Sequence, residues 1–248
     1  MSEDKEKGID ILNLDAIGKP LDTATKSVFE GAGVFLSKIC LPAAEEFGLL
    51  LKDKVSIWRA KNMAEVVNKA AKKMNQDTEN NKKHGHPRLV CSALNNSSWI
   101  DVEEVQDMWA GLLTSSCTYD GKDDSNLIFI NILAQMTSPE VKILNFVCKK
   151  AKMEADSLGL VTANSFRTTK DELSAVSEIN DVYRIDRELD HLNALDLIEG
   201  YFGLGPDDEE IDDSDAYLEP TPLGINMYVR SQGSLLPPVK FFNIPFSL

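Results

Sequence analysis

Two histidines, His84 and His86, are the first candidates for metal chemistry in this chain. They lie in 80–87, a polar segment without hydrophobic periodicity and with the composition of an exposed loop. A zinc site takes three or four protein ligands, and no further histidine or paired cysteine lies nearby in the sequence. We therefore interpret the pair as loop histidines and expect no bound metal.

Adjacent carboxylates at Glu103-Glu104 and Asp123-Asp124 could serve acid–base catalysis or bind a cation. Both pairs lie where a helix is predicted to begin, and the helix dipole favours carboxylates there. The chain contains no GxSxG, P-loop, post-strand GxGxxG, HExxH or Cys–His arrangement. Because three histidines are also few for an enzyme, we predict that the protein is not an enzyme and uses no cofactor.

Four cysteines, Cys40, Cys91, Cys117 and Cys148, lie 51, 26 and 31 residues apart, and none forms a CxxC pair. Scattered cysteines among apolar or small neighbours are typical of buried, reduced thiols in a cytosolic protein. No signal peptide is recognisable, and no run of about 18 apolar residues could span a membrane. We therefore expect a cytoplasmic protein, with peripheral membrane attachment left open.

Charge is unevenly distributed along the chain. The net charge is −14, which argues against general affinity for nucleic acid or anionic membranes. Residues 52–88 nevertheless contain ten basic and four acidic residues, a net of +6, so the remainder carries −20. This stretch is either a solvated lysine-rich helix face or a face that contacts an anionic partner.

The element that must position this basic stretch is the segment 31–74. After Pro42, which suits a first helical turn, apolar residues recur at steps of three to five residues. We predict one helix over 42–74, about 50 Å long at about 1.5 Å per residue. In the apolar run before it, Gly31 and Gly33 each cost a helix about 1 kcal/mol, which indicates either close packing of another helix or insertion into a membrane or partner.

Candidate contacts to a membrane or a protein partner therefore come from the apolar run and the basic stretch. They are Gly31, Gly33, Val34, Phe35, Lys52, Lys54, Arg59, Lys61, Lys69, Lys72 and Lys73. A basic amphipathic helix can bind anionic bilayers.

Local capping patterns predict several other helix boundaries. Residues 101–104 and 169–172 have the form of capping boxes. Ser138 is predicted to cap a helix that runs to about 158 and ends at Gly159.

The C-terminal third has the element order of a winged helix: two helices, a strand at 197–202, an acidic loop at 207–215, a strand at 216–219 and a last helix. A DNA-reading winged helix needs a basic recognition helix, because phosphate neutralisation dominates DNA affinity. The candidate recognition helix at 182–195 is rich in acidic residues. We therefore interpret the module as structural or as a protein-contact module.

The predicted fold class is mainly α, with a long-helix bundle followed by a C-terminal winged-helix-like module that contains a small β-hairpin. We predict a polar tail at 1–20, a helical domain at 21–160, a winged-helix-like domain at 161–233 and an extended apolar tail at 234–248.

Three segments, 31–62, 86–116 and 123–144, resemble the Abi-alpha family of bacterial proteins, named for abortive infection. The residues that carry the resemblance are Pro42, Glu45, Gly48, Trp58, Trp99, Trp109, Leu112-Leu113 and Asp124-Ser125, and the ending at 221–233 also fits. The resemblance implies a role in bacterial defence against phage, and it supplies no catalytic residues.

Two functions from different classes remain open. The first is a non-enzymatic defence component that binds a phage-encoded or co-encoded protein, with or without perturbation of an anionic membrane. The second is a winged-helix transcriptional regulator that binds DNA. The acidic composition favours the first, and nucleic acid is not an expected partner.

Overall fold

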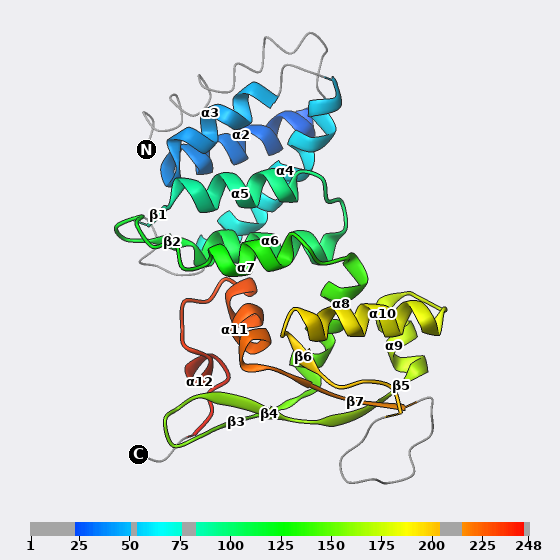
Figure 1. Cartoon of the computed structure of the whole chain (residues 1–248). Coiled ribbons are helices and arrows are strands. Elements are labelled where there is room, and N and C mark those ends of the chain that lie inside the picture. The colour runs from blue at the N-terminus through cyan, green and yellow to red at the C-terminus, as the bar shows by residue number, and fades with distance from the viewer. Residues whose placement is uncertain (1–22, 51–53, 76–82, 204–214, 246–248) are drawn as a thin grey trace. The chain divides into compact units, whose positions relative to one another are not determined.

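The computed structural model describes residues 23–50, 54–75, 83–203 and 215–245 (Figure 1). The chain divides into two compact units. Unit 1 comprises residues 1–134 and 231–234, and unit 2 comprises residues 135–230 and 235–248. Taken over both units, the described residues are mainly helical with small antiparallel sheets, so the predicted fold class is confirmed at this level.

Unit 1 is a helical assembly built around one central helix. Its elements are α2 (Thr23–Ile39), α3 (Leu41–Leu50), α4 (Lys54–Asn75), β1 (His84–Gly85), α5 (Pro87–Ser97), α6 (Glu103–Ser115), β2 (Cys117–Thr118) and α7 (Leu127–Leu133). α4 packs most extensively against α2 and α6 and also contacts α3 and α5. The buried face of α4 is rich in small residues, among them Ala60, Ala64 and Ala70, which let neighbouring helices approach closely.

The prediction of one helix over 42–74 is wrong. The segment contains two helices, α3 and α4, with residues 51–53 between them outside the described part of the chain. Pro42 of α3 and Met63 of α4 line the same pocket, whereas a straight helix would place them roughly 30 Å apart at about 1.5 Å per residue. Two helices that pack on each other bury Phe47 and Met63 together, which one straight helix cannot do.

The apolar run before α3 packs inside unit 1. Phe29 and Leu36 of α2 are fully buried, and the rings of Phe29 and Phe47 meet edge to face with centroids 6.1 Å apart. Gly31 lies at the approach of α2 to α4, where an added Cβ would be 3.2 Å from Asn68 Oδ1. Asn68 also donates a hydrogen bond of 3.2 Å to the carbonyl of Val28, which joins the two helices.

Unit 2 combines helices with a hairpin and a three-stranded sheet. Its elements are α8 (Ser138–Lys150), β3 (Lys152–Ala155), β4 (Val161–Asn164), β5 (Phe166–Thr169), α9 (Lys170–Ser177), α10 (Val182–Ala194), β6 (Ile198–Glu199), β7 (Asp215–Pro220), α11 (Pro222–Ser231) and α12 (Pro238–Phe241). The antiparallel sheet has the order β5-β7-β6, with Phe166 opposite Leu218 and Ile198 opposite Pro220.

The predicted order of elements in the C-terminal third is observed, from the two helices α9 and α10 through the strands β6 and β7 to α11. Assignment to the winged-helix class stays a prediction, as does a domain boundary at 160/161. Most of the predicted acidic loop, residues 207–214, lies outside the described part of the chain.

Capping predictions had mixed outcomes. The box at 169–172 is confirmed, since the Thr169 hydroxyl accepts from the Glu172 amide and the Glu172 carboxylate accepts from the Thr169 amide. α6 has Val102 as its N-cap without a side-chain hydrogen bond, so the cap predicted at Asp101 is wrong. α8 is capped by Thr137 rather than by the predicted Ser138, because Thr137 forms the reciprocal capping box with Glu140.

Two further predictions about unit 2 are wrong in part. The helix predicted to reach 158 ends at Lys150 and is followed by the β3–β4 hairpin, in whose turn Gly159 has a φ of +78°. The C-terminal tail contains the short helix α12 rather than being extended throughout. Phe242 and Ile244 of this tail pack against the buried cluster of Val161, Ile225 and Val239.

Among the described helices, none combines the length and the apolar character that crossing a bilayer requires.

Candidate functional site

Two of the three tryptophans lie together at the surface of unit 1. Trp109 is 1% exposed, as expected of a large core residue, whereas Trp58 is 44% and Trp99 57% exposed. Their ring centroids are 6.5 Å apart and their planes are inclined by 54°. Trp58 lies on α4 and Trp99 in the turn after α5, so contact between the two helices joins residues 41 positions apart.

Arg59 is held in one geometry beside this pair. Its guanidinium lies over the Trp99 ring, 4.2 Å from the centroid. Its Nε and Nη2 donate to Ser98 Oγ at 3.1 and 3.0 Å, and Nη2 also donates to Asn95 Oδ1 at 3.1 Å. The Nη1 group makes no hydrogen bond within the described residues, so it is available to donate a hydrogen bond to an acceptor on another molecule. We call Trp58, Arg59 and Trp99 the tryptophan–arginine surface.

The backbone beneath Arg59 is itself fixed by hydrogen bonds. Ser98 Oγ donates to the carbonyl of Asn95 at 2.6 Å, and Asn62 Nδ2 donates to the carbonyl of Ser98 at 3.1 Å. Asn62 is buried on α4, and its amide therefore connects that helix to the turn that carries Trp99. A contact surface built this way loses little conformational entropy when a partner binds.

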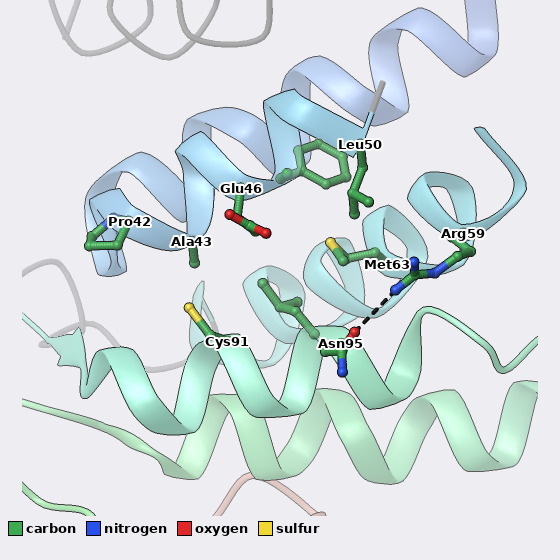
Figure 2. Close-up of a pocket in the computed structure, with 10 residues that line it drawn as sticks. Pro42, Ala43, Glu46, Leu50, Arg59, Met63, Cys91 and Asn95 are labelled. Carbon is green, nitrogen blue, oxygen red and sulfur yellow. Dashed lines mark hydrogen bonds between the residues drawn. The ribbon is translucent and has the colours of Figure 1, made fainter. Parts of the chain in front are cut away.

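A pocket of about 390 Å³ lies between α3, α4 and α5, with Arg59 in its lining (Figure 2). Each helix contributes side chains at helical spacing, so that they share one face. The lining residues are Pro42, Ala43, Glu46, Phe47 and Leu50 of α3, Arg59 and Met63 of α4, and Cys91, Leu94 and Asn95 of α5. Most of the lining is apolar, and a few polar groups converge on it, as in ligand and side-chain pockets generally.

Figure 2 shows how the polar groups of the pocket are distributed. The bond between Arg59 and Asn95 lies at the Leu50 end of α3, whereas Cys91 faces Ala43 near the other end. Glu46 extends from α3 toward α5 between them. The pocket therefore has its cation at one end and its carboxylate on the opposite wall.

The cysteines near the pocket are poor nucleophiles. Burial raises the pKa of both the Cys40 and Cys91 thiols, and the charge of Glu46 further raises that of Cys91. Burial raises the pKa of Cys117 to about 12. Since the thiolate is the reactive form, these thiols remain protonated and unreactive at neutral pH.

Unit 2 contains a hydrogen-bonded group of buried carboxylates that the sequence interpretation missed. Glu140 of α8 is 1% exposed and contacts His191 Nδ1 of α10 at 2.5 Å. Glu188 of α10 is 2% exposed, accepts from the Thr137 hydroxyl at 2.7 Å and pairs with Arg187 at 2.9 Å. The i, i+3 spacing of Glu188 and His191 on one helix was the available signal. The arrangement joins α8 to α10 and satisfies both carboxylates.

The two loop histidines and the Glu103-Glu104 pair, which are candidates for metal or acid–base chemistry, have structural roles. His84 lies on β1 with Nδ1 3.2 Å from the carbonyl of Lys38, and His86 caps α5 by accepting from the Arg88 amide at 3.3 Å. Glu103 and Glu104 occupy the first turn of α6, as predicted. Within the residues that the structure describes, no cluster of three or more His, Cys, Asp or Glu side chains could hold a metal ion.

The predicted contact residues do not form one surface. In α2, Gly33 is buried, and Val34 and Phe35 are half-buried. On α4, Lys61 and Lys72 are exposed and Lys73 is half-buried. Lys69 pairs with Asp107 of α6 at 2.9 Å, which neutralises its charge within unit 1. Lys52 and the side chain of Lys54 lie outside the described part of the chain. Among the predicted residues whose side chains the structure describes, Arg59 alone lines the pocket.

A family model for abortive infection alpha matches residues 59–227. The chain belongs to this family. The matched region includes Arg59, Trp99 and the α5 side of the pocket, and it extends across unit 2. Membership suggests a role in abortive-infection-type defence. The comparisons with curated proteins and with solved structures returned no match.

Proposed function

We propose that this member of the abortive infection alpha family is a non-enzymatic defence component that acts by binding another protein through the tryptophan–arginine surface and the adjoining pocket. The observation that carries this proposal is the exposed Trp58–Trp99 pair with Arg59 locked against it. Tryptophan and arginine dominate the energetic centres of protein interfaces, where they are enriched beside well-packed pockets. Exposed apolar clusters on soluble proteins mark interaction sites more often than they serve packing.

A protein partner fits this site better than an anionic bilayer does. Glu46, which lines the pocket, and its neighbour Glu45 are both exposed on α3 and would repel anionic headgroups. The apolar run of α2, offered by the sequence as an insertion segment, has Phe29 and Leu36 fully buried in unit 1. Insertion would require the loss of those contacts, so membrane perturbation is not part of the proposal.

Unit 2 fits a structural, winged-helix-like module better than a DNA reader. α10 occupies the place of a recognition helix, and Arg184 and Arg187 on it lie 3.6 and 2.9 Å from the buried carboxylate of Glu188. Both arginines share this one carboxylate, which reduces the positive charge that they can offer to phosphates, and phosphate binding depends on uncompensated cations.

The test is protection against phage in a bacterial host that expresses the protein. Replacement of both Trp58 and Trp99 with alanine should abolish the reduction in plaque number, because it removes the contact surface. Tyr183→Ala is the matched control, since Tyr183 is 84% exposed and lies on α10 in the other unit. All variants must retain the wild-type far-ultraviolet circular dichroism and thermal transition. Full protection by the folded Trp58→Ala/Trp99→Ala variant would contradict the proposal.

A further inference from the structure

The turn of the β3–β4 hairpin presents two leucines to solvent. Leu158 is 81% and Leu160 62% exposed. The turn that carries them is firmly held, because Asp156 Oδ1 accepts from the amides of both Leu158 and Leu160 at 2.8 Å. Backbone hydrogen bonds between Asp156 and Leu160 and between Gly159 and Asp156, each 3.0 Å, close the turn. We call residues 156–160 the hairpin tip.

Neither the core of unit 2 nor the capping of its helices accounts for these leucines. The strands themselves are paired over four residues, from Lys152 opposite Asn164 to Ala155 opposite Val161. Met153, Ala155 and Ala163 pack on the buried cluster of unit 2. The hairpin is therefore anchored at its base, and its tip displays apolar side chains in a fixed geometry that suits binding.

We infer that the hairpin tip of one copy of this chain docks in the pocket between α3, α4 and α5 of a second copy. The inference rests on the proposed function, because it names a partner for the same surface. The occupant is a second copy of the chain, since the hairpin tip and the pocket are both present in the one sequence.

The tip and the pocket match in size and polarity. The pocket of about 390 Å³ is walled largely by apolar side chains and has room for the two adjoining leucine side chains. Asp156 lies beside the leucines with Oδ1 engaged in the turn, so its Oδ2 can face outward. Arg59 offers its Nη1 group at one end of the pocket. Because Glu46 occupies the opposite wall, we place the Asp156 carboxylate at the Arg59 end.

Charge sets the orientation of the tip only locally. Unit 2 carries −10 and unit 1 carries −4, so the net charges of the units do not draw them together. The complementary pair is the Asp156 carboxylate of the tip with the Arg59 guanidinium of the pocket, which fixes the direction of docking.

The contact is heterologous, because it joins different surfaces of the two copies. Such contacts leave one unused tip and one unused pocket on every pair, so the assembly either closes into a ring or continues as a chain. A tip of five residues gives a small interface, and small interfaces are weak, with dissociation constants on the order of 10–100 µM.

Sedimentation velocity of the full chain over about 5–200 µM covers this range of affinity. We expect the weight-average sedimentation coefficient of the wild type to rise with concentration. Leu158→Asp/Leu160→Asp should weaken association at least about 30-fold, the loss typical of an interface hot spot. Asp156→Asn keeps an acceptor for the turn and removes the charge, and should weaken it several-fold. Tyr183→Asp is the control, because it introduces an aspartate at an exposed position of the same unit away from the tip.

A mixing experiment tests the heterologous arrangement itself. Cys91→Phe fills the pocket, and Arg59→Glu reverses its charge, so each should abolish self-association while it leaves the tip intact. Leu158→Asp/Leu160→Asp removes the apolar side chains of the tip while it leaves the pocket intact. Each variant alone should sediment as a monomer, whereas a tip variant mixed with a pocket variant should form a 1:1 complex that stops at two chains.

Several outcomes would overturn the inference. They are a wild type that stays monomeric at the highest concentration, a tip variant that associates as the wild type does, and variants that fail to pair on mixing. If the tip variant is monomeric and still protects against phage while Trp58→Ala/Trp99→Ala does not, the tip mediates self-association but that association is not what protects. The proposed function then stands, with a different protein as the partner that the tryptophan–arginine surface binds in defence.

Discussion

At the scale of single residues, the buried carboxylate of Glu188 offers a pH-dependent test of how unit 2 is held together. Burial by itself would raise the pKa of Glu188, but the hydrogen bonds from Arg187 and Thr137 and the charges of Arg187 and Arg184 lower it below its ordinary value. The ionised form is therefore favoured by folding. Its stabilisation is complete above the pKa of glutamate in the unfolded chain and is lost as the pH falls through the lower, folded pKa.

Replacement of Glu188 with Gln should lower the free energy of unfolding by about 1.5–3 kcal/mol at pH 7, the range for hydrogen bonds to charged groups. Urea denaturation of both proteins across the acidic range measures the difference. The gap between wild type and variant should narrow as the pH falls below about 4, where glutamate protonates. An equal gap at every pH would mean that shape, rather than charge, explains the loss.

The carboxylate of Glu219 has a pKa shift opposite in sign to that of Glu188. It lies directly across the β6–β7 pair from Glu199, and its pKa is raised by burial and then by the charge of Glu199. The folded state thus binds a proton more tightly than the unfolded chain, and the ionised carboxylate opposes folding above the folded pKa. Glu219→Gln should therefore stabilise the protein at pH 7 by about 0.5 kcal/mol, as expected for relief of a cross-strand like-charge pair.

Thermal unfolding at two pH values checks this expectation. The stabilisation by Glu219→Gln should vanish in acid, where the wild-type residue is already neutral. Glu199→Gln, which relieves the same repulsion from the other strand, should act in the same direction. A destabilised Glu219→Gln variant would show that the hydrogen bond from the Ser165 backbone to this carboxylate outweighs the repulsion.

At the scale of elements, glycines in helices test how closely segments pack. A Cβ at Gly111 of α6 would lie 1.6 Å from the carbonyl oxygen of Ser231, a backbone atom that cannot yield locally. A Cβ at Gly31 of α2 would lie 3.2 Å from Asn68 Oδ1, the end of a side chain that can move. Overpacking against backbone costs about 1–3 kcal/mol or more, whereas an exposed Gly→Ala change in a helix gains up to about 1 kcal/mol.

Gly111→Ala should therefore destabilise unit 1 by about 3 kcal/mol, while Gly31→Ala should be neutral or mildly stabilising. Chemical denaturation of the two variants side by side makes the comparison, because both add one methyl group to a helix. Equal effects would mean that residues 231–234 can move away from α6 at no cost.

Features of the fold that depend on neighbouring residues are predictable from sequence, whereas features that depend on packing between elements are not. The cap at Thr169 depends on residues within one turn, so its sequence pattern predicts it correctly. The division of 42–74 into α3 and α4 depends on what each helix packs against, and periodicity alone carries no such information. The β3–β4 hairpin was missed because its pairing joins residues up to twelve positions apart within a sequence of helical composition.

The candidate site was harder to predict than the fold for the same reason. Trp58 has the spacing of a core residue on α4, and Trp99 lies in a turn, so neither position by itself predicts that the two rings meet. Their contact, and the position of Arg59 over Trp99, exist because α4 packs on α5. The sequence shows that Trp58 and Arg59 are adjacent, but it does not show that the Trp58 and Trp99 rings are exposed.

At the scale of the whole molecule, the net charge of −14 opposes the compact state through self-repulsion. Added salt screens that repulsion, since the Debye length falls to about 10 Å at 0.1 M. We expect the thermal midpoint to rise by a few degrees between about 10 mM and 0.3 M sodium chloride. A fall in the midpoint would mean that ion pairs such as Lys69–Asp107 outweigh the general repulsion.

The distribution of tryptophan has a consequence for spectroscopy. Of the three indoles, Trp109 is shielded in the core, while Trp58 and Trp99 face water beside the pocket. A collisional quencher in water should therefore reach the two exposed rings and spare the third. Any molecule that covers the tryptophan–arginine surface should shift their emission to shorter wavelength. The chain thus contains its own fluorescent reporter of occupancy, and a partner can be detected in solution without any label.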